Sequence, residues 1–132
     1  MEPGTTCATM ATENDDEVDS LTCKILATKP RPTAIFACSD RVARLIYDAV
    51  GRLGMRIPKD ISIVGYADLV MAEWMRPGLT TIRQHGTEMG AAAARLLVER
   101  SQGKYVSAEP RRIRIKGELV VRGSTAPPSA GS

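Results

Sequence analysis

The sequence predicts an α/β domain with a mainly parallel sheet and flanking helices, because two short apolar runs enclose an amphipathic helix. The first run, Thr33–Cys38, opens after Pro32 and has the composition of a strand buried on both faces. The second, Ile61–Gly65, has the same composition, and residues 41–54 between them repeat apolar side chains at helical spacing. A strand, a helix and a strand in this order make a right-handed βαβ unit with parallel strands.

Composition limits the function classes that the chain can serve. Its 132 residues, 43% apolar and 25% charged, suffice for one domain with a real core and are too few to assume two. A net charge of +3 is small for a dedicated nucleic-acid binder. The sequence contains no run of 18 apolar residues, so no membrane span is predicted. The start of the chain does not resemble a signal peptide.

The three cysteines are widely spaced and show no metal-ligand pattern. We therefore expect free thiols in a reducing, cytoplasmic setting, with Cys38 buried in its strand. No cofactor and no metal site are predicted, and no pairing of nucleophile with base or glycine-rich phosphate loop indicates an enzyme.

The elements before the second strand can each be justified from local residues. Residues 1–14 form a polar, weakly ordered lead-in, and the acidic cluster Asn14–Glu17 suits the first turn of a helix. That helix ends before the prolines of residues 29–32. In the helix of the βαβ unit, Ser39 or Asp40 can cap the first turn, and Gly54 stands where a left-handed residue ends a helix. Its apolar face consists of Val42, Leu45, Ile46, Ala49, Val50 and Leu53.

Beyond Gly65 the pattern is less regular. A turn at residues 76–78 precedes a short strand, Leu79–Arg83, and then a helix, Thr87–Gln102. Alternating basic and apolar residues over Arg111–Lys116 predict a strand with one solvent-exposed face. A further strand is predicted at Glu118–Arg122. The basic side chains Arg111, Arg112, Arg114 and Lys116 are interpreted as a solvated strand face rather than a phosphate-binding stripe, since no aromatic residues interleave them. Residues 123–132 read as a flexible tail.

Five segments resemble, in order and spacing, the LacI/GalR family of bacterial transcriptional regulators. They are Pro-Thr-Ala-Ile-Phe-Ala-Cys-Ser-Asp (32–40), Gly-Met-Arg-Ile-Pro-Lys-Asp-Ile-Ser-Ile-Val-Gly-Tyr (54–66), Pro-Gly-Leu-Thr-Thr-Ile-Arg-Gln (77–84), Met-Gly-Ala-Ala-Ala (89–93) and Gly-Glu-Leu-Val-Val-Arg-Gly-Ser-Thr-Ala-Pro-Pro (117–128). The resemblance implies the C-terminal portion of a periplasmic binding protein type I-like fold, with residues 15–122 forming part of an effector-binding and dimerisation domain. DNA would be bound only through a helix-turn-helix domain that this chain does not contain.

The resemblance implies that Ser39, Asp68 and Gln84 contact a small polar effector such as a sugar. Each has an alternative: Ser39 as a helix cap, Asp68 as a cap of the turn after its strand, and Gln84 as a backbone contact at a hinge. The family pattern Gly-Phe/Tyr-Asp-Asp appears here with Ala67 in place of its first aspartate. That departure removes the carboxylate that would accept hydrogen bonds from sugar hydroxyls.

The same resemblance implies a homodimer with Met71, Trp74 and Met75 in the interface, the alternative for Trp74 being local core packing. The helix Thr87–Gln102 would pack on a sheet that this chain mostly lacks, so Met89, Leu96 and Leu97 would be exposed or covered by a partner. Two functions therefore compete: an effector-sensing and dimerisation portion of a regulator, or a truncated regulator that acts as an interaction module without binding an effector.

Overall fold

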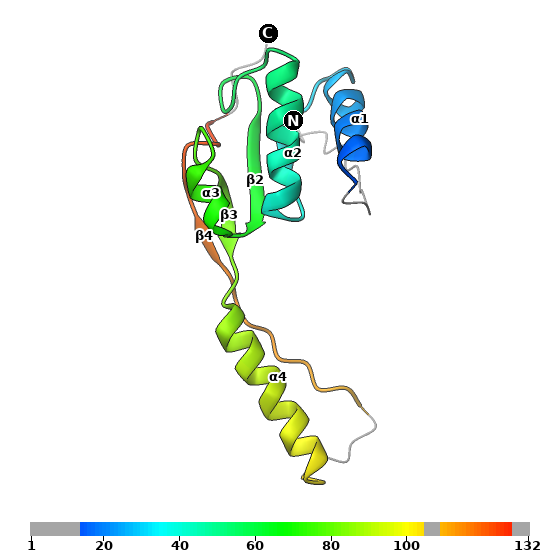
Figure 1. The fold of residues 1–132 in the computed structure, drawn as a ribbon, viewed down its shortest axis with the longest axis vertical. Helices are drawn as coiled ribbons and strands as arrows, with labels where there is room; N and C mark the ends of the chain where they lie inside the picture. Colours follow the sequence, from blue (N-terminus) through cyan, green and yellow to red (C-terminus); the bar gives the residue numbers. More distant parts are fainter. Residues whose placement is uncertain (1–13, 105–108, 128–132) are drawn as a thin grey trace, which may run out of the picture.

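The computed structural model describes residues 14–104 and 109–127, so the predicted lead-in lies outside the described residues except for Asn14. Helices and strands alternate along most of this part of the chain (Figure 1). Their bounds are α1 Asp15–Leu26, β1 Ala34–Phe36, α2 Asp40–Arg52, β2 Ser62–Ala67, α3 Val70–Trp74, β3 Thr80–Arg83, α4 Gly86–Ser101 and β4 Glu118–Val120.

The strands form one sheet in the order β1-β2-β3-β4. β1 and β2 are parallel, as are β2 and β3, whereas β4 runs antiparallel to β3. The predicted mainly parallel sheet with flanking helices is therefore confirmed. α2 packs on the sheet and α1 packs on the outer side of α2, which gives the body of the molecule its layers (Figure 1).

α2 is the element that its sequence describes best. Val42, Ile46 and Val50 are each at most 4% exposed and belong to the hydrophobic core cluster. Ser39 caps the first turn, because its side chain accepts a hydrogen bond from the backbone N–H of Val42. The helix ends before Gly54, whose φ of +68° lies in the left-handed region that glycine tolerates.

Only one face of the sheet is covered by helices, which corrects the prediction of a first strand buried on both faces. The strand register places Phe36, Tyr66 and Leu119 on the face away from α2. Phe36 is 64% exposed there and Leu119 56% exposed. Cys38 is also exposed, not buried as expected, because β1 is the edge strand and ends two residues earlier.

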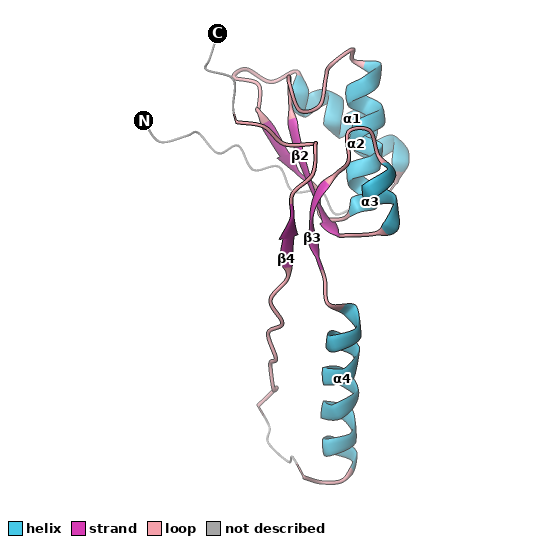
Figure 2. Cartoon of the chain, turned by 90° about the vertical axis from the view of Figure 1, so that its left-hand side faces the viewer, coloured by secondary structure: helices cyan, strands magenta, loops and turns pink. Residues whose placement is uncertain are grey.

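α4 and the extended segment 109–117 project together from this body as an arm (Figure 2). No residue of α4 is buried, and the expected exposure is confirmed for Met89 and Leu97, while Leu96 is half-buried. The predicted strand Arg111–Lys116 does not form. A strand needs a neighbour for its backbone hydrogen bonds, and segment 109–117 lies beside a helix instead.

The packed structure continues past Gly123, where the flexible tail was predicted to begin. Ser124 is fully buried: its hydroxyl accepts from Thr80 N at 2.8 Å and donates to Ile63 O at 2.6 Å. These bonds attach the segment after β4 to two central strands, which a polar, proline-containing composition does not reveal. The assignment of residues 15–122 to a partial effector-binding and dimerisation domain stays a prediction.

Candidate functional site

Three parallel strands end at one edge of the sheet, and a predicted effector residue follows each of them. Ser39 comes after β1, Asp68 directly after β2 and Gln84 directly after β3. Ligands of open α/β sheets bind beyond the carboxyl ends of parallel strands. The topology therefore brings the three predicted residues to one edge, although their side chains take different roles there.

Of the two residues predicted as possible caps of α2, Ser39 caps the helix and its neighbour Asp40 does not. The Asp40 side chain is fully buried and accepts hydrogen bonds from Leu69 N at 2.7 Å and from Thr81 Oγ1 at 2.6 Å. It therefore connects the start of α2 to β3 and to the loop after β2. This connection fixes the relative positions of the strand ends that make the edge.

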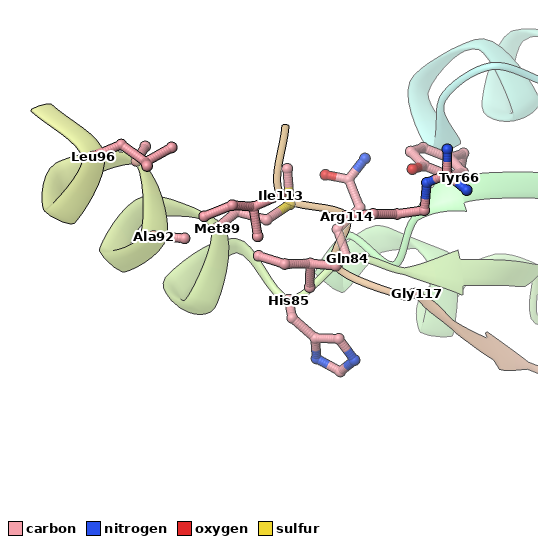
Figure 3. A pocket seen from close by; sticks show the side chains of 11 residues that line it. Tyr66, Gln84, His85, Met89, Ala92, Leu96, Ile113, Arg114 and Gly117 are labelled. Carbon is pink, nitrogen blue, oxygen red and sulfur yellow. The ribbon is translucent and has the colours of Figure 1, made fainter. Parts of the chain in front are cut away.

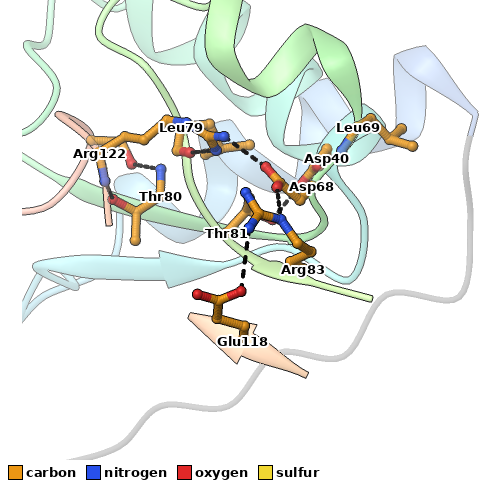
Figure 4. A network of polar contacts seen from close by, with 10 residues as sticks. Asp40, Asp68, Leu69, Leu79, Thr80, Thr81, Arg83, Glu118 and Arg122 are labelled. Atoms are coloured by element: carbon orange, nitrogen blue, oxygen red, sulfur yellow. Dashed lines mark hydrogen bonds and ion pairs between the residues drawn. The ribbon is translucent and has the colours of Figure 1, made fainter. Parts of the chain in front are cut away.

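Asp68 is held by two arginines and does not cap a turn (Figure 4). Its carboxylate oxygens lie 2.7 Å from Arg83 Nε and 2.8 Å from Arg122 Nη2, and its side chain is 8% exposed. Arg83 also pairs with Glu118 at 3.2 Å. Burial acts to raise the pKa of the Asp68 carboxyl, but hydrogen bonds and charge from Arg122 and Arg83 outweigh it and lower this pKa. Both carboxylate oxygens are thus engaged within the protein.

The backbone is unusual at the turn between β2 and α3. Ala67 has a φ of +123° and Asp68 a φ of +57°, both in regions that side chains disfavour. Such residues cost on the order of 1–3 kcal/mol each and are found preferentially at functional sites. Here the ion pairs of Asp68 and the hydrogen bond from Leu69 N to Asp40 hold the turn.

A cavity of about 370 Å³ lies between α4 and segment 109–117 and reaches the end of β2 (Figure 3). Gln84 lines it, but Ser39 and Asp68 do not. Tyr66, Gln84 and Arg114 gather at one end, and the imidazole of His85 points away. Most of the remaining wall is apolar: Met89, Ala92, Ala93, Leu96, Ile113 and Ile115. The cavity has the size of a small-molecule site with a polar end.

Sequence reasoning missed several residues that shape this edge. Arg83, Arg122 and Ser124 lie within the segments that resemble the family, but the sequence pattern predicts no role for them, although the last two stand in one Arg-Gly-Ser-Thr run. Arg114 was assigned to a solvated face, yet it lines the cavity, while Arg111 of the same basic cluster pairs with Glu99 at 2.6 Å. Nothing in the local pattern separates these two arginines, because the difference depends on how the segment lies against α4.

The predicted dimer residues have different environments. Trp74 is 68% exposed, so it does not belong to the core, and Met71 is half-buried. Met75 is 7% exposed and packs inside the core, where it offers no surface to a partner. Leu69 and Val70, at 46% and 68% exposed, extend the apolar surface around Trp74, and sequence reasoning overlooked both.

The described residues offer neither a metal cluster nor a membrane-spanning helix. No group of three or more His, Cys, Asp or Glu side chains there could hold a metal ion. None of the helices in residues 14–104 or 109–127 has the length and apolar character that crossing a membrane requires.

Comparison with known proteins places the fold in a family. Residues 3–125 match the family model of the periplasmic binding protein-like domain. The HTH-type transcriptional repressor PurR of Pasteurella multocida is 44% identical over 101 residues, which are 76% of this chain and 30% of that protein. A lactose operon repressor from Rhizobium radiobacter is 37% identical over 106 residues, covering 80% of this chain and 91% of that sequence.

Solved structures agree. A LacI family regulator from Enterococcus faecium with bound ribose has a TM-score of 0.72 and 33% identity over 87% of this chain and 41% of that one. The regulator CelR in complex with cellobiose has a TM-score of 0.75 and 33% identity, covering 85% of this chain and 34% of that one. The chain thus spans less than half the length of PurR and of these two solved structures, which are transcriptional regulators, and this chain is not an enzyme. It belongs to the LacI/GalR family of bacterial transcriptional regulators, within that family's periplasmic binding protein-like effector domain.

Proposed function

We propose that this chain forms one wall of the effector cleft of a cytoplasmic LacI/GalR regulator and takes a small, polar, sugar-like ligand there. The observation that carries the proposal is the convergence of Ser39, the turn at Asp68, and Gln84 at the carboxyl ends of three parallel strands. Gln84 also lines the cavity, which gives a ligand an amide donor and acceptor beside an apolar wall. Relatives solved with ribose and with cellobiose support a sugar-like ligand.

Within an intact regulator, DNA binding would belong to a helix-turn-helix domain outside this chain. The effector would act by binding one arrangement of the regulator better than another, since a ligand shifts a conformational equilibrium only by its difference in affinity. The Asp40 and Asp68 connections make the strand ends a rigid support for such a ligand.

The test is ligand-linked stability. We expect a sugar at about 100 times its dissociation constant to raise the free energy of unfolding by about 2.7 kcal/mol, which a thermal melt detects readily. Gln84→Ala should reduce the shift, whereas Gln102→Ala, beyond the end of α4 and outside the cavity lining, should leave it unchanged. No stabilisation by ribose, cellobiose or a wider sugar panel would contradict effector binding by this chain.

We also propose that the exposed surface formed by Leu69, Val70 and Trp74 is a homodimer interface. A large aromatic side chain among apolar neighbours is typical of an interface anchor. Sedimentation velocity should show a dimer that Trp74→Ala converts to monomer, with Leu97→Ala as the control because Leu97 is 70% exposed but lies on α4. A monomer at all concentrations would contradict this interface.

The second candidate function is an interaction module that dimerises without binding an effector. The observation that favours it is chemical: Ala67 supplies no carboxylate, and both oxygens of Asp68 are engaged by arginines. If the chain is a dimer and no ligand stabilises it, the result would favour the interaction module over effector sensing.

A further inference from the structure

The cavity between α4 and segment 109–117 is electrostatically one-sided. Arg114 lines it, together with the polar side chains of Tyr66 and Gln84, and no acidic residue does. Figure 3 shows the Arg114 side chain running toward Tyr66 and lying beside Gln84. A cationic group therefore stands at the polar end of a cavity whose other walls are mostly apolar.

Arg114 differs from the other arginines around the cavity and the strand edge. Arg83 and Arg122 are both paired with Asp68, Arg83 is also paired with Glu118, and Arg111 is paired with Glu99. Arg114 forms no ion pair or hydrogen bond with another described residue. Its five N–H donors are thus available to a ligand, and a guanidinium suits the paired oxygens of a phosphate or carboxylate.

We propose that the ligand of this cavity is an anion: a sugar-sized molecule whose phosphate or carboxylate oxygens bind Arg114 while its hydroxyls reach Gln84 and Tyr66. The inference rests on the proposed function, because Gln84 belongs to both, and it narrows the ligand from polar to negatively charged. It also accounts for the missing acid at Ala67, since a second carboxylate near this edge would repel an anion.

The experiment compares neutral and anionic probes on the whole chain. Dissociation constants are measured by calorimetry for ribose and glucose, for ribose 5-phosphate and glucose 6-phosphate, and for glucuronate. A charge-assisted hydrogen bond contributes enough for an anionic probe to bind about tenfold or more tightly than its neutral parent. Higher salt should reduce this preference, since Arg114 is exposed to solvent.

Two variants distinguish anion binding in the cavity from general electrostatic attraction to the basic segment 111–116. Arg114→Gln should abolish the preference for the anion, and Arg112→Gln should retain it, because Arg112 is exposed in the same segment but does not line the cavity. Phosphate esters and glucuronate distinguish the two anionic groups: tighter binding of either class supports the proposal and names the group.

Each contrary outcome has a distinct meaning. Neutral and anionic probes that bind equally would overturn the anion preference and leave the proposed sugar-binding function standing. An anion preference lost equally in both variants would also overturn it, since the attraction would then belong to the basic segment. No binding by any of the five probes would contradict the proposed function together with this inference.

Discussion

Gly65→Ala tests whether the carboxyl edge of the sheet is as tightly assembled as the contacts indicate. A methyl group added at Gly65 would clash with Asp40 Oδ1 and would stand 2.7 Å from Leu79 Cδ2. Ordinary contacts between carbon atoms are about 3.5–4.0 Å, so both neighbours would have to move. Neither is free to do so, because Asp40 and Leu79 are fully buried.

The cost follows from the two groups that the methyl group displaces. Overpacking a core costs about 1–3 kcal/mol. Moving the Asp40 carboxyl breaks a hydrogen bond with Thr81 or Leu69, which leaves a buried donor unsatisfied at a further cost of about 1–3 kcal/mol. The sum, about 2–6 kcal/mol, is a large part of the 5–15 kcal/mol that holds typical domains folded.

Urea unfolding followed by far-UV circular dichroism measures this, since the single tryptophan is too exposed to report on the core. A loss of this size lowers the midpoint by about 1–3 M. Gly51→Ala is the matched control: Gly51 lies in α2 with nothing within 4 Å of an added methyl group, so alanine should stabilise by about 0.5–1 kcal/mol. Equal midpoints for Gly65→Ala and the wild type would refute the reasoning.

Three further predictions concern buried and paired side chains. Ser124→Ala should lower the free energy of unfolding by about 1–3 kcal/mol in urea, because Thr80 N loses its acceptor, whereas exposed Ser101→Ala should cost less than half as much. The pKa of Asp68 is lower in the folded protein, so its stabilisation is present above the unfolded pKa of about 3.9 and is lost as pH falls through the folded value. Urea midpoints measured between pH 6 and pH 2 should therefore fall less steeply in Asp68→Asn than in the wild type; parallel curves would contradict this. The hydrogen bonds from Arg56 lower the pKa of Asp60 to about 2, so an NMR titration of the Asp60 carboxyl should move upward toward 3.8 in Arg56→Gln, and an unmoved titration would disprove the pairing.

Helix α2 and the carboxyl edge of the sheet show which features can be predicted from the sequence alone. Caps and helix ends depend on residues a few positions apart, so the roles of Ser39 and Gly54 could be predicted correctly. The site could be predicted only in outline: parallel strands bring Ser39, Asp68 and Gln84 to one edge, but their hydrogen bonds do not follow from that. Asp68 meets Arg122 across 54 positions of sequence, and no local pattern signals such a pair.

The sequence by itself determined the βαβ unit, the family, and the exposure of Met89 and Leu97 on α4, because periodicity and ordered motifs are properties of the chain. Only the tertiary structure decided which strand faces stay uncovered, that segment 111–116 finds no strand to pair with, and that Arg114 turns to a cavity while Arg111 meets Glu99. The physical reason is that hydrogen bonds, ion pairs and burial each require a partner, and the partner's position is fixed only when distant segments pack.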